Sequence, residues 1–579
     1  MNKLYQKSAL VFGEDTRSFL TVIRSLHRQG MLVDVVCFSN NSVALSSNCI
    51  RNAYGLNYQS MSPSEWNKAV TDILNKNAYD LVIPCDERAL FPLLDIKDAI
   101  QAETKFALPE RKDLGPLFNK VDTRTTAQAC DVPVASGEVL PSDKLDFETL
   151  AKQYGSPLVL KPTQSYEEEQ LNKRQSVLIA KSAESVEQFK IENADSDILV
   201  ESYFSGYGIG VSILATEGEV SAAFAHARVS EPESGGGSSY RKAIAIDPSM
   251  LYACQKFCMH LNYTGVAMFE FKYNPNTHDW ILIEVNARFW GSLPLAVHAG
   301  VDFPALLAKS LLLGIKEPKL HYNLSAYARR FSADIYDIKK EFDQLKSANK
   351  FKAFSQLLKR LFSFTRLLTF NDKIDSFAWH DPKPFLNEAF DLVKDKLHGL
   401  PYIRTQRQSD RISQFKKSIA SQPVENVLFV CYGNIMRSPF ARALFEKKTA
   451  GTKLSHLNVD SFGFHQIENR NAKPACVDMA KTYDIDLTKH QSKWLPQSTA
   501  SMPNTIILMF DMKNEYLLSS YYNDTTAISL ADLVPERHGF YREIADPYGK
   551  SQEYLEHCYQ LINDSVDNLI HLLEANIDV

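Results

Sequence analysis

Near the C-terminus a cysteine and an arginine lie six residues apart, Cys431 and Arg437, at the end of an apolar run. Residues 427–430 are apolar and β-prone and predict a buried strand, and residues 438–447 predict the helix that follows. Backbone N–H groups of a loop that ends at a helix N-terminus form an anion-binding cup. In such a cup Cys431 would act as a thiolate nucleophile, and the planar fork of Arg437 would grip two phosphoryl oxygens.

Three further residues complete this predicted phosphate site. Ser438 can donate a hydrogen bond to the thiolate, and Asn434 can hold the loop in shape. The chemistry still needs an acid that protonates the leaving oxygen. Asp546, in the sequence ADPYG, offers this acid, with Pro547 restricting the backbone beside it.

A second group of residues suits nucleotide phosphates and a hard metal ion. Lys161 ends the predicted strand SPLVLKP, a position suited to phosphate, although a single strand lysine is more often a solvated edge residue. Glu270, Glu284 and Asn286 lie on two strand-like runs joined by an Asn/Pro/Asp turn, and pairing of these strands would bring three oxygen donors together. Such donors suit Mg²⁺. Arg288 would point the same way as Asn286 and could stabilise a transferring phosphoryl group; the alternative is a hairpin with ordinary surface acids.

A glycine-rich segment between these residues predicts a mobile flap. Residues 235–237 are glycines flanked by serines, which cannot pack a core. Arg228 or Arg241 could meet a substrate carboxylate there, and a plain disordered loop is the alternative. Cys254 and Cys258 have the i, i+4 spacing of an apolar helix, which favours core packing over metal binding.

The N-terminal residues predict alternating strands and helices. The sequence SALVFG predicts a strand, residues 16–30 a helix that Gly30 ends, VDVVCFS a second strand, residues 63–77 a helix, and YDLVIPCDE a third strand. That last strand ends in Asp86 and Glu87, where open α/β sheets place their ligands. Without a GxGxxG turn a dinucleotide site is not expected, so residues 1–112 are interpreted as a half-Rossmann support domain.

Residues 424–579 resemble a low molecular weight protein tyrosine phosphatase. The matching segments are VLFVCYGNIMRSP, HQSKWL at 490–495, MFDMKN at 509–514 and DPYG at 546–549. The resemblance implies a doubly wound parallel-sheet domain, a phosphocysteine at Cys431, Arg437 as the phosphate clamp, and Asp546 as acid and then as base for water. Met436 stands where the family often has a second cysteine, so a loop disulfide is impossible. Tyr432 replaces a smaller residue.

Residues 113–320 resemble an ATP-grasp α+β domain preceded by a half-Rossmann (pre-ATP-grasp) domain. The matching segments are NKVDT, PLVLKP, ILVESYFSGYGIGVSIL, YTGVAMFEF and LIEVNARFWGSLPLAV, and the last points to carboxylate-amine ligases close to carbamoyl-phosphate synthase and biotin carboxylase. The resemblance implies that Lys161 contacts ATP phosphates and that the segment around Glu201 forms the adenine hinge, with Arg228 also on the nucleotide side. It implies Mg²⁺, or alternatively Mn²⁺, on the carboxylate and amide set described above, and Arg288 on an acyl phosphate or γ-phosphate.

Composition limits the other function classes. The 579 residues carry a net charge of −5, which argues against a nucleic-acid partner, and the nine cysteines show no paired framework, which favours the cytoplasm. No export signal or membrane span is expected. Residues 321–423 predict a helical, basic region that packs on the ATP-grasp body or contacts a membrane surface, and then a polar tether.

The sequence therefore predicts a multidomain α/β enzyme with two active sites. The ATP-grasp domain would join a small-molecule carboxylate to an amine with MgATP, and the C-terminal domain would hydrolyse phosphotyrosine or another phosphomonoester. By analogy, the pair would serve envelope or exopolysaccharide biosynthesis. One alternative makes the phosphatase a phosphotyrosine-recognition or regulatory module for the ligase. Another is arsenate reduction, which needs resolving cysteines that Cys476 and Cys558 do not offer by their spacing.

Overall fold

The computed structural model describes residues 4–56, 60–100, 103–163, 177–193, 196–230, 238–348, 350–397, 401–522, 525–534 and 543–577. The chain divides into two compact units. The first comprises Met1–Phe38, Ser42–Gly55 and Asn67–Phe390, and the second comprises Ser39–Asn41, Leu56–Trp66 and Asp391–Val579. Residues 231–237, which contain the three glycines of the predicted flap, lie outside the described residues.

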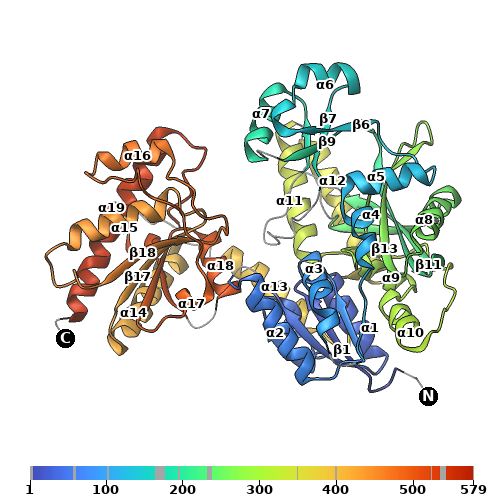
Figure 1. The fold of residues 1–579 in the computed structure, drawn as a ribbon, viewed down its shortest axis with the longest axis horizontal. Helices are drawn as coiled ribbons and strands as arrows, with labels where there is room; N and C mark the ends of the chain where they lie inside the picture. Colours follow the sequence, from blue (N-terminus) through green and yellow to red (C-terminus); the bar gives the residue numbers. More distant parts are fainter. Residues whose placement is uncertain are drawn as a thin grey trace. The chain divides into compact units, whose positions relative to one another are not determined.

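The first unit begins with a parallel sheet in the strand order β3-β2-β1-β4-β5. Its strands are β1 (Ser8–Gly13), β2 (Leu32–Cys37), β3 (Asn52–Gly55), β4 (Leu81–Pro84) and β5 (Lys105–Phe106). The helices between them are α1 (Ser18–Arg28), α2 (Pro63–Lys76) and α3 (Glu87–Ile96) (Figure 1). The predicted βαβ unit is confirmed, and α1 ends before Gly30, whose φ of 81° suits a residue without a side chain.

A small antiparallel sheet follows in the order β6-β9-β7-β8. Its strands are β6 (Gly137–Pro141), β7 (Leu158–Pro162), β8 (Leu178–Ala180) and β9 (Asp197–Ser202). Helices α6 (Phe147–Tyr154) and α7 (Ala183–Glu192) belong to this region, whereas α4 (Leu114–Phe118) and α5 (Lys120–Ala129) pack in the core of the next sheet. Apolar residues of β7, β9, α6 and α7 bury a core of their own, so this region packs as a small lobe.

The largest sheet of the described residues runs β14-β13-β10-β11-β12-β15-β16. Its strands are β10 (Tyr207–Thr216), β11 (Glu219–Ser230), β12 (Tyr240–Ile244), β13 (Gly265–Tyr273), β14 (Trp280–Asn286), β15 (Tyr327–Arg329) and β16 (Asp372–Ile374). Helices α8 (Pro248–Leu261), α9 (Leu293–Ala299) and α10 (Phe303–Leu313) belong to the same region. Cys254 and Cys258 are buried in the core between α8 and the sheet, which confirms core packing for this pair.

The sequence predicted a helical region after residue 320, but the structure shows that this region is not wholly helical. Helices α11 (Phe331–Ala348), α12 (Lys350–Ser363) and α13 (Lys383–Leu397) are present, but β15 and β16 add two strands to the large sheet. Three residues are too few for a periodic signal, so these strands could not be read from the sequence. Fully buried Arg329 anchors them through ion pairs with Asp334 and Asp372. This region is therefore an integral part of the first unit.

The second unit contains a parallel sheet in the order β18-β17-β19-β20. Its strands are β17 (Asn426–Cys431), β18 (Asn458–Gly463), β19 (Thr505–Met509) and β20 (Thr526–Ser529). Its helices are α14 (Pro401–Ser421), α15 (Arg437–Thr449), α16 (Pro474–Lys481), α17 (Gln497–Ala500), α18 (Met512–Tyr521) and α19 (Gln552–Ile577). Strand order reverses between β17 and β19, and in open α/β sheets ligands bind outside the carboxyl ends of the strands at such a point.

The polar segment that leads into β17, residues 404–426, was predicted to be a tether, and the structure corrects this: the segment is mostly helical. It forms the helix α14, whose Phe415 and Ile419 are 3% and 2% exposed in the core of the second unit. Two apolar residues one turn apart in a polar helix give a weak sequence signal. The compact unit therefore begins before residue 424.

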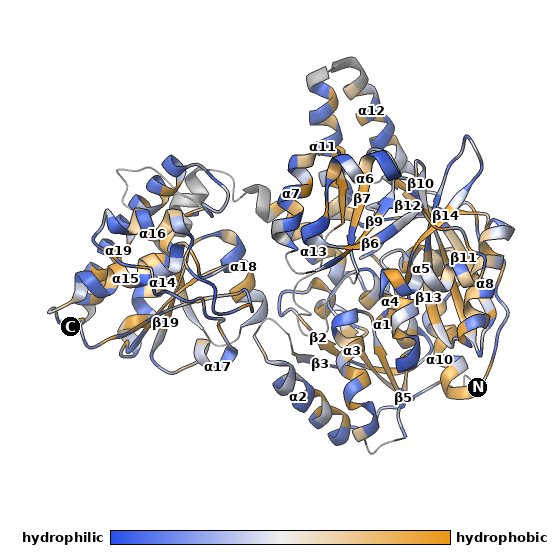
Figure 2. Cartoon of the chain, turned by 45° about the horizontal axis from the view of Figure 1, so that its top comes forward, coloured by the Kyte–Doolittle hydropathy of each residue, from blue (hydrophilic) through white to orange (hydrophobic). Residues whose placement is uncertain are grey.

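The hydropathy of the residues differs between the strands and the helices. Figure 2 shows the sheet strands of both units mainly in hydrophobic colours and mixed colours along the helices. Among the described residues no single helix is long and apolar enough to cross a membrane. Helices α9 and α10 reach that length and composition only together, and they are bent by 87°.

Candidate active sites

The loop between β17 and α15 folds around the sulfur of Cys431. The Asn434 backbone N–H donates to Cys431 Sγ at 3.2 Å, and Ser438 Oγ lies 3.1 Å from the same sulfur. Cys431 is 2% exposed and Ser438 is fully buried. The second residue of α15 and the preceding loop thus direct hydrogen-bonding groups at one buried sulfur, which is the arrangement the sequence predicted.

Asn434 fixes the shape of this loop. Its φ of 51° is left-handed, a conformation that asparagine tolerates better than most residues. Its side-chain amide donates to Ser438 Oγ at 2.9 Å and to Ser461 Oγ at 3.0 Å, and its carboxamide oxygen accepts from the Lys493 backbone N–H at 2.8 Å. The His490 ring donates from Nε2 to the Asn434 carbonyl at 2.7 Å. The asparagine therefore ties the loop to β18 and to the segment that carries HQSKWL.

Arg437 is held in place by acidic groups from two later segments. Its Nη1 donates to Asp511 Oδ2 at 2.6 Å and to the Ile544 carbonyl at 2.9 Å, and its Nη2 lies 3.1 Å from Asp546 Oδ2. Burial lowers the pKa of this guanidinium, but the negative charges of Cys431, Asp546 and Asp511 outweigh that effect and raise the pKa. Arg437 is 1% exposed, whereas the Asp546 side chain is 45% exposed.

The structure therefore brings the five predicted C-terminal residues together. A sulfur nucleophile, a buried guanidinium and a solvent-facing carboxylate lie at one loop, and the serine and asparagine support it. Such an arrangement can bind a phosphoryl group, attack it with sulfur and protonate a departing oxygen.

In the first unit, Lys161 and Glu201 form a buried ion pair across β7 and β9. Lys161 Nζ lies 2.6 Å from Glu201 Oε2, and Arg124 Nη1 lies 3.1 Å from Glu201 Oε1. Both partners of the Lys161 pair are 6% exposed. Sequence reasoning placed these two residues separately on the nucleotide and did not foresee the contact between them.

The predicted metal ligands lie on one face of adjacent strands. Glu270 on β13 is directly opposite Glu284 on β14, and Asn286 follows two residues later on the same face. Asn286 Nδ2 donates to Glu284 Oε1 at 3.0 Å, which fixes the amide beside the carboxylate. The described residues contain no group of three or more His, Cys, Asp or Glu side chains placed for a metal. Two carboxylates and an amide oxygen fit Mg²⁺ that keeps water and phosphate ligands better than a metal caged by protein alone.

Two arginines near these carboxylates contact acidic side chains. Arg228 on β11 donates to Glu270 Oε2 at 2.9 Å. Arg288 contacts Glu87 Oε1 through Nε at 3.1 Å and through Nη2 at 2.9 Å. Glu87, the first residue of α3, thereby brings the end of the N-terminal sheet against the strand that carries Glu284 and Asn286.

Arg241 does not line a substrate site, contrary to the alternative raised for the flap. Its guanidinium is 2% exposed and forms a two-pronged ion pair with Asp375 at 2.6 and 2.7 Å. The contact joins β12 to the segment after β16, so this arginine has a structural role.

The C-terminal residues match a known family. Residues 426–578 match the model described as low molecular weight phosphotyrosine protein phosphatase. The phosphatase Etp of Escherichia coli K12, named a low molecular weight protein-tyrosine-phosphatase, is 31% identical over 153 residues, which are 25% of this chain and 91% of Etp. Through this domain, the chain belongs to the low molecular weight protein-tyrosine-phosphatase family. The probable phosphatase EpsP of Ralstonia nicotianae is 28% identical over 26% of this chain and 98% of EpsP.

The first unit matches a second family model. Residues 194–328 match the model described as ATP-grasp in the biosynthetic pathway with Ter operon. Among solved structures, an L-amino acid ligase from Bacillus licheniformis is similar with a TM-score of 0.43 and 16% identity over 53% of this chain and 75% of the ligase. A biotin carboxylase from Campylobacter jejuni is similar with a TM-score of 0.44 and 16% identity over 56% of this chain and 75% of the carboxylase. The chain therefore carries a phosphatase-family domain and, over residues 194–328, a region similar to an ATP-grasp family model.

Sequence reasoning missed one residue of the phosphatase site, Asp511. The residue lies inside the MFDMKN segment, but its contact with Arg437 spans 74 positions and has no local signal. Asp511 also caps α18 from the position before its first residue, where its carboxylate accepts from the Asn514 backbone N–H at 2.7 Å. The cap and the ion pair together fix the direction of this carboxylate.

Tyr432, which stands where the family often has a smaller residue, changes the surroundings of the phosphatase site. Lys513 Nζ lies 3.3 Å from the centre of the Tyr432 ring, so this tyrosine forms a wall with a cation on its face.

Cys476 and Cys558 are both buried, and burial raises the pKa of these thiols to about 11 and about 12. Neither is poised as a resolving thiolate, which disfavours the arsenate-reductase alternative.

Proposed function

We propose that the phosphatase domain hydrolyses phosphomonoesters, with phosphotyrosine as the substrate class, through a phosphocysteine on Cys431. The thiolate attacks phosphorus while Arg437 and the loop N–H groups hold the phosphoryl oxygens. Asp546 protonates the leaving phenolic oxygen, and its carboxylate then takes a proton from the water that cleaves the S–P bond. The observation that carries this proposal is the convergence of Cys431, Arg437 and Asp546 at one loop.

The intermediate offers the sharpest test of this mechanism. Acid quenching of the protein during turnover of a ³²P-labelled aryl phosphate should leave label on the wild-type chain and none on Cys431→Ser. Turnover without trapped label, or retained turnover in Cys431→Ser, would contradict the covalent route. If the domain instead recognises phosphotyrosine without hydrolysing it, the wild-type protein would bind a phosphotyrosine peptide without releasing phosphate.

For the ATP-grasp domain, we propose ATP-dependent joining of a carboxylate to an amine through an acyl phosphate. Lys161 would contact the ATP phosphates once it separates from Glu201, and the backbone of β9 would face the adenine. Glu270, Glu284 and Asn286 would hold Mg²⁺, or Mn²⁺ in its place, which would neutralise phosphate charge. Arg228 pairs with Glu270 in this structure and would contact the ATP phosphates when the nucleotide binds.

Arg288 is the residue we propose to stabilise the transferring phosphoryl group. Its present contact with Glu87 means that the guanidinium would exchange one anion for another as substrate binds. The supporting observation is that Arg288 follows the two β14 ligands on the same strand end. The test is ADP release across a matrix of carboxylates and amines, with the amide product identified by mass spectrometry. Release that requires both partners supports the ligase, and release with water alone as acceptor contradicts it.

The cellular setting we propose is envelope or exopolysaccharide assembly, in which the phosphatase acts on a phosphotyrosine protein. The support is the similarity of the phosphatase domain to EpsP and Etp, and the association is by resemblance. Deletion of the gene segment for the phosphatase should raise phosphotyrosine on one or a few proteins. An unchanged level of protein phosphotyrosine in the deletion strain would contradict this proposal.

A further inference from the structure

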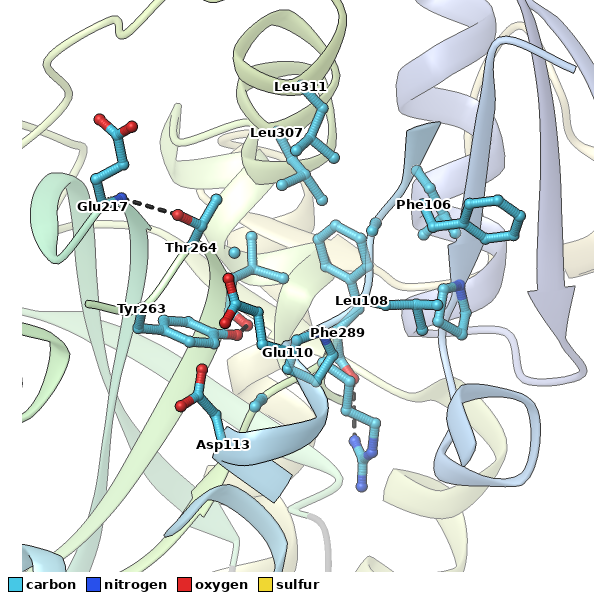
Figure 3. Close-up of a pocket in the computed structure, with 18 of the residues that line it drawn as sticks. Phe106, Leu108, Glu110, Asp113, Glu217, Tyr263, Thr264, Phe289, Leu307 and Leu311 are labelled. Carbon is cyan, nitrogen blue, oxygen red and sulfur yellow. Dashed lines mark hydrogen bonds between the residues drawn. The ribbon is translucent and has the colours of Figure 1, made fainter. Parts of the chain in front are cut away.

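A cavity of about 410 Å³ lies in the first unit, apart from the predicted magnesium ligands. Its wall is formed by the segment after β5, the start of β13, the residues after β14 and one side of α10 (Figure 3). The apolar part of the wall includes Phe106, Leu108, Val266, Phe289, Leu307 and Leu311. A space of this size, with an apolar body and a few polar groups, suits a small organic ligand.

Asp113 is the polar group that distinguishes this cavity. It is 5% exposed and lines the cavity, where Figure 3 shows its carboxylate turned towards the side chains of Tyr263 and Glu110. Across the described residues, the Asp113 carboxylate makes no hydrogen bond and no ion pair. Although Asp113 directly precedes α4, its side chain does not cap that helix. A buried carboxylate without a partner is costly, and burial raises the pKa of Asp113.

The surrounding charges compensate this carboxylate only in part. Lys112 attracts it electrostatically and opposes the rise in its pKa, but the Lys112 ammonium pairs with Glu110, at 2.8 Å. A third acidic side chain, Glu217, lies at the same cavity, 3.6 Å from Lys316. Among the described residues that line the cavity, the one cationic side chain is Arg288, whose guanidinium contacts Glu87. The cavity thus has an apolar body and an acidic end.

We propose that this cavity binds a small organic cation, an ammonium or guanidinium group on an apolar chain, with Asp113 as its counter-ion. The apolar chain lies against Phe289, Leu307 and Leu311. The cation gains a desolvated partner, and the carboxylate gains a cation in direct contact.

If the proposed ligase activity holds, the cavity also defines a class of substrate. An ammonium held by a carboxylate has no free electron pair, so the anchored group is not the nucleophile. The substrate then carries a second, reacting group, as a diamine or a basic amino acid does. This extension rests on the proposed function, whereas binding of the cation does not.

Calorimetric titration of the full chain without ATP tests the binding directly, with n-hexylamine, 1-hexanol and hexanoate as probes at pH 7. We expect n-hexylamine to bind more tightly than the neutral or anionic probe. Asp113→Asn should weaken its binding about tenfold or more, because one partner of a buried charge pair is lost. The matched control Glu187→Gln removes an exposed carboxylate that pairs with Lys190 and does not line the cavity, and it should change affinity less than about threefold.

A second variant guards against misfolding of Asp113→Asn. Leu311→Lys places an ammonium in the cavity from a half-buried position on α10 and should block n-hexylamine, with the folded state of the variant checked by its cooperative thermal unfolding. No binding of n-hexylamine at millimolar concentration, or equal affinity in wild type and Asp113→Asn, would overturn the site. ADP release with diamines and neutral amines alike, at the same KM in Asp113→Asn, would overturn the link to the ligase while leaving the binding result intact.

Discussion

Asp511 and Arg437 form an ion pair of 2.6 Å inside the phosphatase site, and Asp511 is itself held by the first turn of α18. The carboxylate therefore sets the orientation of the guanidinium before any phosphate binds. Asp511→Asn should keep the helix cap but weaken this restraint. We expect kcat/KM for an aryl phosphate to fall about 10- to 100-fold, since small misplacements of a binding group are costly.

Two comparisons test this role of Asp511. Asp511→Ala should show a similar loss of activity and should also lose about 1 kcal/mol of stability, because the cap is removed. Asp484→Asn, which removes a largely exposed carboxylate paired with Lys447, is the control and should leave kcat/KM unchanged. Full activity in Asp511→Asn would show that Arg437 is positioned by other groups.

Asp546→Asn should slow poor leaving groups more than good ones. The carboxylate lies 3.1 Å from Arg437 and faces solvent, as a group that donates a proton to a departing oxygen requires. We expect kcat to fall about 10²- to 10⁴-fold for phenyl phosphate and less for p-nitrophenyl phosphate, whose leaving group needs little protonation. Steady-state assays of both substrates provide the ratio. An equal loss for the two esters would argue that Asp546 binds substrate and does not act as the acid.

Much of the phosphatase site could be predicted because its residues lie in one short stretch. Cys431, Asn434, Arg437 and Ser438 fall within eight positions, and a strand followed by a helix dictates the loop that joins them. Asp511 could not be predicted, because its contact depends on the order in which β17 and β19 pair. Helix α14 was missed because two buried side chains, Phe415 and Ile419, are hidden in an otherwise polar sequence.

For the predicted ATP-grasp residues too, local sequence patterns predicted some contacts, whereas contacts between distant residues could not be predicted. The hairpin that places Glu270 opposite Glu284 follows from two strand patterns and a turn, and the structure confirms the pairing of these strands. The partner of Arg288 is Glu87, 201 positions away in another sheet, and no local pattern predicts that contact. The Lys161–Glu201 pair was missed for a similar reason, since β7 and β9 are adjacent in the sheet but not in the sequence.

Glu201→Ala should destabilise the first unit. The change leaves Lys161 and Arg124 without their shared carboxylate in a buried setting, which costs about 3–5 kcal/mol. Scanning calorimetry should show the transition of the first unit at a lower temperature and that of the phosphatase domain unchanged. The control Glu187→Ala removes a largely exposed partner of Lys190 and should leave both transitions in place. Equal unfolding temperatures of the first unit in Glu201→Ala and wild type would mean that the Lys161–Glu201 ion pair adds no net stability.

His226 should make the first unit sensitive to acid. The ring is buried on β11 opposite Gly210, where a side chain on the glycine would lie 2.1 Å from the ring. Burial, with Arg228 and Arg241 nearby, lowers its pKa from 6.5 to about 3. The unfolded chain therefore binds a proton at higher pH than the folded chain. Stability from this residue is fully present above pH 6.5 and is lost as pH falls towards 3, by about 1.4 kcal/mol per unit.

The variant His226→Gln isolates this effect from the titration of other groups. Calorimetric unfolding of the first unit at several values between pH 4 and pH 8 should show a shallower pH dependence in the variant than in wild type. Parallel curves for the two proteins would mean that His226 is not held neutral in the folded state.

The central claim is that one chain carries two separate catalytic sites, and matched assays of two variants test it most directly. ADP release and aryl phosphate hydrolysis would be measured side by side in wild type, Glu284→Gln and Cys431→Ser, with the carboxylate and amine that give ADP release in wild type. The account predicts that Glu284→Gln abolishes ADP release and retains hydrolysis, and that Cys431→Ser does the reverse. Loss of ADP release in Cys431→Ser, or retained ADP release in Glu284→Gln, would contradict it.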